Sequence, residues 1–477
     1  MLFNSFIFFI FLGVILPIYY SIPKKNGRNL FLLLASYFFY GYWDWRFCGL
    51  LLLSTLIDFY IGLQIEKAPS QKKKKLFMLT SVFVNLGILG FFKYFNFFVE
   101  SFEKLGSSLG VHFDYLHLNI LLPVGISFYT FQTLSYSIDI YRGKLTPTKN
   151  IIDFALFVSF FPQLVAGPIE RAVDLLPQIS KKQIPSRIQI EKGIHLIVTG
   201  LFRKVMIGDT AGRYVDHIFS NIQDYKSSEL IAAAFIFSIQ IYADFSGYSN
   251  IARGTAKLLG FELMKNFEQP YLSRNITEFW RRWHISLSSW LKDYLYISLG
   301  GNRKGGFKTK VNLFITMLLG GLWHGASLNF IIWGALHGLF LSIHKKMIGS
   351  QKTINNSVTI NSFVDLKIIV NIIFTYLIAV FTFLIFRLTK WEDQVLFFNK
   401  MINWEASDFT WKFTSITIAF ISLSFLFDLL EYKTKRHTFL LSLKNKSMQY
   451  GILSALFLIT LLFMFQSDPL PFVYFQF

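Results

Sequence analysis

Long apolar runs, separated by short clusters of basic residues, constrain the fold of this chain more than any other feature. Residues 3–22 are nearly unbroken apolar and are followed by Lys24 and Lys25, and residues 47–64 lead in the same way to the lysines at 72–75. In a lipid bilayer such runs must satisfy their backbone hydrogen bonds internally, as a helix does. Basic clusters on alternate loops follow from the positive-inside bias. The pattern predicts an all-α, polytopic integral membrane protein surrounded by the lipid bilayer.

Composition supports this class. Hydrophobic residues make up 53% of the 477 residues and aromatic residues 18%, a balance typical of polytopic membrane proteins. The formal net charge of +19 would suggest nucleic-acid binding in a soluble protein. Here membrane topology accounts for the charge, because Lys and Arg fall between apolar runs, and we expect no nucleic-acid partner. The single cysteine, Cys48, excludes an intrachain disulfide and a paired-cysteine metal site, and we predict no bound metal.

The apolar runs predict one integral domain over 1–477, of roughly ten to twelve helices, with its core motifs at 120–345. We interpret 3–22 as a retained first span, because its charges follow the apolar core instead of preceding it. Residues 151–168 carry two prolines and a glycine. They are expected to form a buried or re-entrant element, since irregular backbone at membrane depth is tolerated only inside protein. Further apolar runs lie at 29–43, 47–64, 76–92, 118–140, 193–207, 229–243, 311–322, 328–344, 366–386, 413–429 and 448–465, with an outer segment at 94–117.

Two histidines, each preceded by a tryptophan, are the main candidates for chemistry. Trp283-His284 and Trp323-His324 lie forty positions apart in a chain with nine histidines. An imidazole exchanges a proton near neutral pH, so such a pair in aromatic surroundings fits a general base. A Trp-His dipeptide also fits a hydrogen-bonded histidine of the core. The sequence has no GxSxG elbow, no HExxH and no paired carboxylates, so the simplest chemistry is activation of an acceptor hydroxyl that attacks an acyl donor.

The run before His324 predicts where this residue lies in the bilayer. Only the twelve mostly apolar residues 311–322 follow the basic cluster at 303–310. Twelve helical residues reach about 18 Å, well short of the roughly 30 Å of hydrocarbon. We therefore expect His324 to lie within the membrane thickness.

Polar and aromatic residues inside the apolar runs are candidates for the wall of a substrate tunnel, because polar side chains in hydrocarbon need partners. Asp244 fits structural pairing as well as substrate contact, and His337 fits packing as well as a direct role. Basic residues near the histidines are suited to binding donor phosphates, although topogenic anchoring predicts them equally. The tunnel candidates are Trp323, Trp283, His337, Asp244, Gln132, Tyr129 and Ser127, and the donor-binding candidates are Arg281, Arg282, Arg303 and Lys304.

The sequence resembles the membrane-bound O-acyltransferase family, and within it the branch of bacterial alginate O-acetyltransferase-like proteins. The resemblance rests on FWRRWHISLSSWLKDYLYISLGGNR at 279–303 and on LGGLWHGASLNFIIWGALHG at 319–338, and it extends in order over residues 30–400. Other blocks similar to that branch are LPVGISFYTFQTLSYSIDIYRG at 122–143, FPQLVAGPIERA at 161–172 and DFSGYSNIARG at 244–254.

This resemblance implies a helical bundle with a central tunnel, in which His324 is the catalytic histidine and His284 the second active-site position. It implies no bound cofactor, acetyl-CoA as the cytoplasmic acyl donor, and an extracytoplasmic SGNH-hydrolase-like acetyltransferase as partner. The implied activity moves acetyl groups across the bacterial cytoplasmic (inner) membrane for O-acetylation of an envelope polysaccharide, either peptidoglycan or an alginate-like exopolysaccharide. Two alternatives stay open, which are D-alanyl transfer to teichoic acids by the same fold and a polytopic transporter or flippase.

Overall fold

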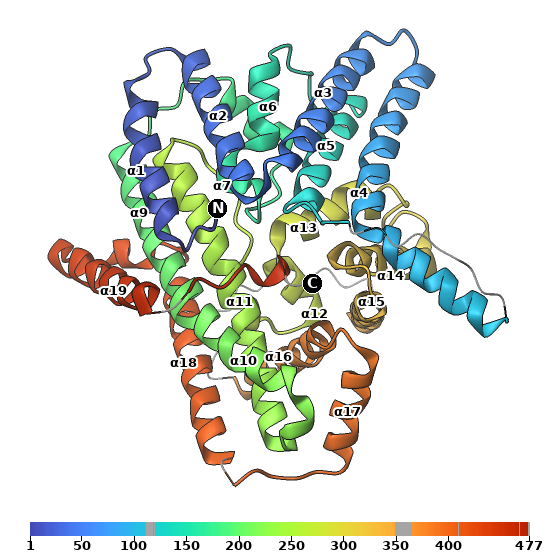
Figure 1. The fold of residues 1–477 in the computed structure, drawn as a ribbon, viewed down its shortest axis with the longest axis vertical. Coiled ribbons are helices and arrows are strands. Elements are labelled where there is room, and N and C mark those ends of the chain that lie inside the picture. The colour runs from blue at the N-terminus through green and yellow to red at the C-terminus, as the bar shows by residue number, and fades with distance from the viewer. Residues whose placement is uncertain (111–117, 119, 349–364, 409, 467, 476–477) are drawn as a thin grey trace. The chain divides into compact units, whose positions relative to one another are not determined.

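All regular secondary structure in the part of the chain that the structure describes is helical, which confirms the all-α class. The structure is a computed structural model that describes residues 1–110, 118, 120–348, 365–408, 410–466 and 468–475. Six of the described helices are long and apolar enough to cross a membrane. They are α3 (Arg46–Lys67), α4 (Gln71–Ser108), α11 (Ser227–Leu258), α16 (Leu366–Arg387), α18 (Thr410–Thr434) and α19 (Lys446–Gln466) (Figure 1).

The chain forms two compact units, each with its own core. The prediction of a single integral domain stays a prediction. Unit 1 comprises Met1 and residues 3–190 and 255–264, and unit 2 comprises Leu2 and residues 191–254 and 265–477.

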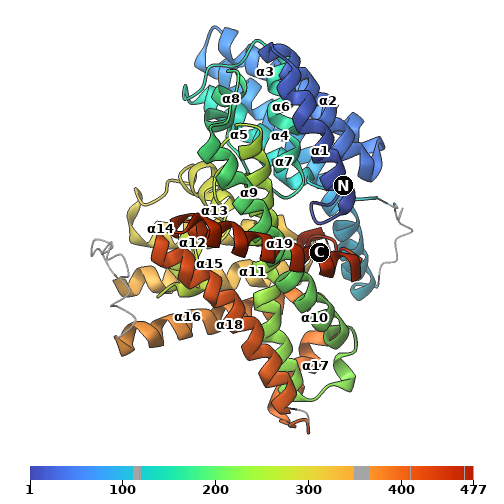
Figure 2. The same cartoon turned by 90° about the vertical axis from the view of Figure 1, so that its left-hand side faces the viewer.

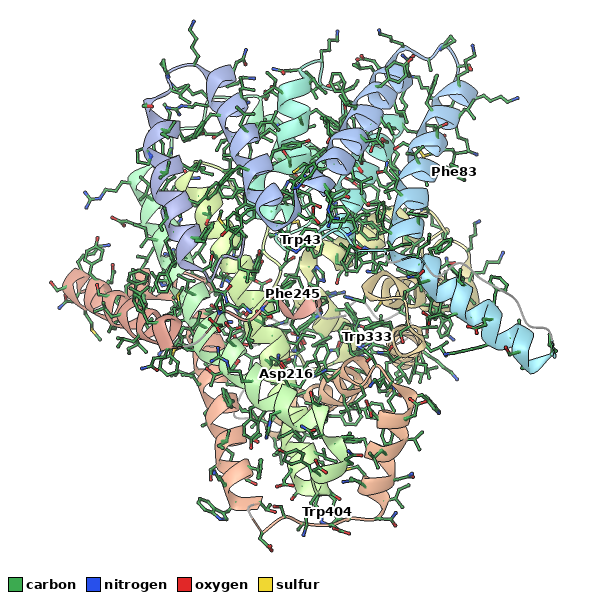
Figure 3. The ribbon with its side chains drawn as sticks, in the orientation of Figure 1. Trp43, Phe83, Asp216, Phe245, Trp333 and Trp404 are labelled. Carbon is green, nitrogen blue, oxygen red and sulfur yellow. The ribbon has the colours of Figure 1, made fainter. Side chains whose placement is uncertain are left out.

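The interior of unit 1 is polar where three of its helices meet. Asp58 on α3 accepts hydrogen bonds from Ser81 Oγ (2.6 Å) and Asn85 Nδ2 (2.8 Å) on α4. Ser137 Oγ on α5 also donates to this carboxylate, as burial of a polar group requires. The outward side of α4 is apolar, and Phe83 on it is 79% exposed (Figure 3). The remaining helices of this unit are α1 (Phe6–Ser21), α2 (Lys25–Asp44), α5 (Ile126–Tyr141), α6 (Ile151–Ser159), α7 (Phe161–Leu164) and α8 (Ala172–Ile179).

Two sequence-based boundaries in unit 1 can be compared with the structure. The predicted break between a span at 76–92 and an outer segment at 94–117 is wrong, because α4 continues through it to Ser108. Lys93 at that break is a good helix former and does not end the helix, and residues 111–117 lie outside the described part. The element expected at 151–168 is indeed interrupted, since α6 and α7 are both short and are buried.

Unit 2 holds most of the remaining helices, and α9 (Arg187–Leu201) begins in unit 1 while α11 ends there. Residues 202–209 continue α9 as a π-helix, so the chain is helical from Arg187 to Ser220. The remaining elements are η1 (Phe202–Asp209), α10 (Thr210–Ser220), η2 (Ile222–Asp224), η3 (Pro270–Leu272), α12 (Ile276–Arg282), α13 (Ile285–Trp290), η4 (Leu291–Tyr296), α14 (Gly305–His324), α15 (Leu328–Ile348), α17 (Trp391–Ile402), η6 (Phe439–Ser442) and η7 (Val473–Phe475).

The hairpin of α14 and α15 is held together by glycine (Figure 1). A Cβ at Gly321 would lie 2.2 Å from the carbonyl oxygen of Phe330 and 2.9 Å from Cα of Gly334. Only glycine, whose side chain is a single hydrogen atom, permits this close approach of two helices. The hairpin therefore fixes the end of α14, where His324 lies.

The expected short helix before His324 is not observed. α14 has 20 residues and begins at Gly305, because its first turns extend through Lys308 and Lys310, and lysine favours the helix. Twenty residues reach about 30 Å, so helix length no longer argues that His324 lies within the membrane thickness. That depth stays a prediction.

After α19 the chain turns back into unit 2. We call residues 468–475 the C-terminal segment, and it runs toward α11 and α12 (Figures 1 and 2). Phe472 in this segment packs against Phe245 and Tyr248 on α11, with ring centroids 5.1 Å away in both cases. The end of the described chain is thus part of the core of unit 2.

Candidate active site

His284 is held in an unusual backbone conformation between α12 and α13. Its φ is +42°, in the left-handed region that non-glycine residues rarely adopt. Neighbouring hydrogen bonds support this turn, since Asn266 accepts from the amide of Ile285 at its carbonyl oxygen (2.8 Å) and from Ser286 Oγ at its side chain (2.6 Å). Backbone strain of this kind concentrates at functional sites. The imidazole is buried, and its ring centroid lies 4.7 Å from that of Phe245.

His324 is the last residue of α14 and is also buried. Its imidazole contacts Trp333 on α15 (5.1 Å between ring centroids) and Phe386 on α16 (5.3 Å). The next residue, Gly325, leaves room for the ring of Phe330, which a Cβ there would approach to 2.1 Å. The hairpin glycines and this packing together fix the direction of the His324 ring.

The structure brings the two predicted histidines into one aromatic cluster within unit 2. Trp323 contacts both imidazoles, at 6.1 Å from His284 and 5.1 Å from His324 between ring centroids. Phe245 on α11 and Trp333 on α15 flank the cluster (Figure 3). Two histidines that lie forty positions apart in the sequence thus belong to one candidate site, and a neutral imidazole can accept a proton there as a general base.

Tyr474 is a member of the cluster that the sequence interpretation missed. Its ring centroid lies 5.3 Å from that of His324 and 6.4 Å from that of His284. It also packs against Phe245 (5.0 Å) and Phe386 (5.9 Å). The C-terminal segment therefore places a phenol beside both imidazoles. The available signal was the aromatic, proline-containing end that follows the last apolar run.

His337 lies next to the cluster and contacts Trp333, which in turn contacts the imidazole of His324. It accepts a hydrogen bond at Nδ1 from Nε1 of Trp280 (3.2 Å), which assigns the other ring nitrogen as the protonated one in the neutral ring. Trp333 lies between the two histidines, 4.6 Å from His337 and 5.1 Å from His324 by ring centroids. His337 is thus placed to orient Trp333.

The comparison with protein families matches this part of the chain. The model of the membrane-bound O-acyltransferase family matches residues 43–387, which include both histidines. The chain belongs to the membrane-bound O-acyltransferase family. It is accordingly an O-acyltransferase and a multi-pass membrane protein, in agreement with its apolar helices.

Curated relatives agree with the family. A protein from Pseudomonas putida named "Probable alginate O-acetylase AlgI" is 42% identical over 436 residues, which cover 89% of this chain and 87% of that protein. A peptidoglycan O-acetyltransferase from Helicobacter pylori is 38% identical over 72% of this chain and 70% of its own length. A teichoic acid D-alanyltransferase from Bacillus subtilis is 28% identical over 47% of this chain and 60% of its own length.

Two further tunnel candidates of this acyltransferase have structural partners in unit 2. Trp283 packs between aromatic rings, including Phe279 (5.5 Å) and Phe383 (4.9 Å) by centroids. Asp244 forms an ion pair with Lys204 (2.5 Å). Of the two roles open for Asp244, structural pairing is the one observed.

Three tunnel candidates lie in unit 1, where they are buried on or beside α5. Gln132 Nε2 donates to the carbonyl oxygen of Phe157 (2.5 Å), and Ser127 Oγ accepts from Lys93 Nζ (3.4 Å). Tyr129 is 1% exposed. Their place in the tunnel of this acyltransferase stays a prediction.

The donor-binding candidates divide into one engaged and three exposed side chains. Arg282 pairs with Glu278 (2.7 Å) and lies over the ring of Tyr432. Burial raises the pKa of Glu278, but Arg282 and Arg274 outweigh it, so the pKa lies below its usual value. Arg281, Arg303 and Lys304 are exposed. Arg303 and Lys304 follow two glycines with positive φ, Gly300 and Gly301. An exposed basic side chain can bind a phosphate or can anchor the chain at the membrane surface. The role of these three residues in donor binding therefore stays a prediction.

Proposed function

We propose that this acyltransferase takes an acetyl group from acetyl-CoA and delivers it for O-acetylation of an envelope polysaccharide. The more similar relatives support acetyl as the acyl group, since their names are alginate O-acetylase and peptidoglycan O-acetyltransferase. The observation that carries the proposal is the cluster of Tyr474 with the two buried imidazoles of His284 and His324 in unit 2. The proposed location is the bacterial cytoplasmic membrane, with the donor on the cytoplasmic side.

In the proposed reaction His324 is the general base. The acceptor O–H gives its proton to the imidazole while its oxygen attacks the thioester carbonyl carbon. The carbon–sulfur bond breaks, an O-acetyl ester forms, and the proton leaves with the sulfur as CoA thiol. His284 lies on the other side of Trp323 and is proposed to orient the acceptor. The aromatic side chains around both rings exclude water that would hydrolyse the thioester.

We also propose that the first acceptor is the phenol of Tyr474. Two observations favour it, namely the contact of its ring with both imidazoles and its place in a segment packed into the core. Tyrosine is among the side chains that form covalent intermediates. A phenol is more acidic than a serine hydroxyl, so its acetyl ester is the more reactive one and transfer onward to an alcohol is downhill. The proposed next acceptor is the serine of an extracytoplasmic SGNH-hydrolase-like partner, which then acetylates the polysaccharide.

The exposed basic side chains are proposed to bind the donor. Arg303 and Lys304 follow Gly300 and Gly301 in a loop before α14, and Arg281 is exposed at the end of α12. Guanidinium and ammonium groups bind phosphate oxygens by charge-assisted hydrogen bonds. We propose this surface for the phosphates of coenzyme A, with no cofactor bound permanently.

The decisive experiment uses the purified full chain and radiolabelled acetyl-CoA. Two quantities are measured, namely the release of CoA thiol and the transfer of the labelled acetyl group from acetyl-CoA to the acceptor. We expect His324→Ala to abolish transfer, because the general base is removed, and to leave the protein monodisperse. His217→Ala, which changes an exposed histidine on α10, is the matched control and should keep transfer. Full transfer by His324→Ala would rule out the proposed role of His324.

D-alanyl transfer is the second candidate, favoured by the similarity to a teichoic acid D-alanyltransferase over 47% of this chain. Offering a D-alanyl thioester on its carrier protein in parallel with acetyl-CoA separates the two. Label transferred from the carrier protein but not from acetyl-CoA would support D-alanylation. A transporter or flippase would cleave neither thioester, so it would release neither CoA thiol from acetyl-CoA nor the thiol of the carrier protein.

A further inference from the structure

Lys204 is a buried cation between two carboxylates of unit 2. Its side chain is 1% exposed, and Nζ lies 2.7 Å from Oδ1 of Asp209 and 2.5 Å from Oδ1 of Asp244. A lysine away from water must be paired. One cation between two anions leaves the cluster with one negative charge more than pairing requires, so it remains paired after loss of either carboxylate.

Close packing of η1 against α11 creates this cluster. A Cβ at Gly208 would lie 3.0 Å from the backbone nitrogen of Asp244, and one at Gly247 would lie 2.8 Å from that of Lys204. The π-helical turn of η1 carries Lys204 and Asp209 together, five positions apart, and such turns are frequent at functional sites. Gly208 and Gly247 thus allow the backbones of η1 and α11 to approach each other closely, and the charged cluster lies between the two helices.

The same cluster binds the backbone of the C-terminal segment. Oδ2 of Asp244 accepts a hydrogen bond from the amide of Val473 (2.6 Å), and Lys204 Nζ donates to the carbonyl oxygen of Pro471 (3.4 Å). Val473 immediately precedes Tyr474. Aromatic packing of Phe472 attracts the segment but is non-directional, whereas these two hydrogen bonds specify which residue lies at which place.

We propose that Asp244 and Lys204 form a latch that holds the C-terminal segment in the register that sets the Tyr474 ring beside His324. They are positioning residues, since they act on the site through the backbone of 471–473. Val473–Phe475 form the 3-10 turn η7, in which a shift by one residue rotates the side chains by about 120° about the helix axis, so loss of the latch removes the phenol from the imidazoles. The expected effect of the latch on acetyl transfer rests on the proposed function of Tyr474. The placement of the segment by the latch does not rest on that function.

The structural part is tested by labelling a thiol at position 474 with a maleimide dye. The parent protein carries Tyr474→Cys on a Cys48→Ser background, so that the chain has a single thiol. Asp244→Ala removes the acceptor of the Val473 amide and leaves Lys204 paired with Asp209. Asp209→Ala is the matched control, because it removes the other carboxylate from the same lysine and leaves the contacts of 471–473 in place. Val473→Pro is the second test variant, since it removes the donor and retains both ion pairs.

We expect Asp244→Ala and Val473→Pro to label about tenfold or more faster than the parent, as loss of a hydrogen bond to a charged group predicts. Asp209→Ala should label at the parent rate. Unchanged labelling in both test variants would overturn the latch, as would equal acceleration by Asp209→Ala, which would indicate general loosening. If Asp244→Ala is not monodisperse, Val473→Pro decides by the same criterion.

Transfer is measured separately in chains that retain Tyr474. Asp244→Ala and Val473→Pro are expected to lose transfer of label at least tenfold, and Asp209→Ala to keep it. Fast labelling together with full transfer leaves the latch in place and removes Tyr474 from the proposed function. Slow labelling together with lost transfer overturns the latch, whatever the fate of the proposed function.

Discussion

Tyr474, in the C-terminal segment, and His324, at the end of α14, lie with their ring centroids 5.3 Å apart. In the sequence, the last three apolar helices, α16, α18 and α19, lie between these two residues. Their contact depends on a return of the chain into the core of unit 2 after α19 (Figure 2). The candidate site of this acyltransferase therefore includes a residue of the C-terminal segment as well as the two histidine motifs.

Tyr474→Phe tests the phenol separately from the ring. The substitution keeps the packing against Phe245 and Phe386 and removes only the hydroxyl. We expect transfer from acetyl-CoA to fall by about 10²-fold or more, with an unchanged unfolding temperature. Tyr248→Phe, in a buried tyrosine that packs against Phe472, is the control and should retain transfer. Equal transfer by Tyr474→Phe and the parent would show that the acceptor is another hydroxyl.

The backbone at His284 predicts an unusual pattern of tolerance. At φ +42° asparagine is accepted more easily than other non-glycine residues, and β-branched residues are strained. His284→Val should therefore lower the free energy of unfolding by about 1–3 kcal/mol, whereas His284→Asn should fold like the parent. Thermal unfolding in detergent measures the difference, and transfer assays on His284→Asn show what the imidazole contributes. Equal stability of the two variants would argue against strain at this turn.

Much of the candidate site could be predicted from the sequence, because the signals for its histidines are local. Trp-His pairs in apolar surroundings identified His284 and His324, and the cost of a membrane carboxylate gave pairing as one role of Asp244. The partner of Asp244 could not be predicted, because a lysine at the end of an apolar run, such as Lys204, is expected at the membrane surface and not in a buried ion pair. Tyr474 was missed for a similar reason, as its place depends on tertiary packing that no local pattern encodes. The helix before His324 was predicted too short because lysines were taken as its end.

The hydrogen bond from Trp280 to His337 predicts a measurable support of the cluster. Trp280→Phe keeps a ring in place and removes the Nε1 donor, so His337 loses the contact that fixes its orientation. We expect the transfer rate to fall about twofold to tenfold, the worth of one hydrogen bond, with an unchanged KM for acetyl-CoA. Trp404→Phe, at an exposed tryptophan (Figure 3), is the control. A raised KM without a change in rate would place Trp280 in donor binding instead.

The glycine contact of the α14–α15 hairpin predicts that a substitution at Gly321, outside the candidate site, reduces acetyl transfer by moving His324. In Gly321→Ala the new methyl carbon would meet the carbonyl oxygen of Phe330 at 2.2 Å, so the hairpin must open and the end of α14 must move. We expect a loss of about 1–3 kcal/mol in unfolding free energy and a larger loss of transfer, because His324 is three residues further along the helix. Gly306→Ala in the same helix has nothing within 4 Å of the new carbon. It should be neutral or stabilising by up to about 1 kcal/mol, since alanine favours the helix over glycine. Equal transfer by the two variants would show that the position of His324 does not depend on the hairpin contact.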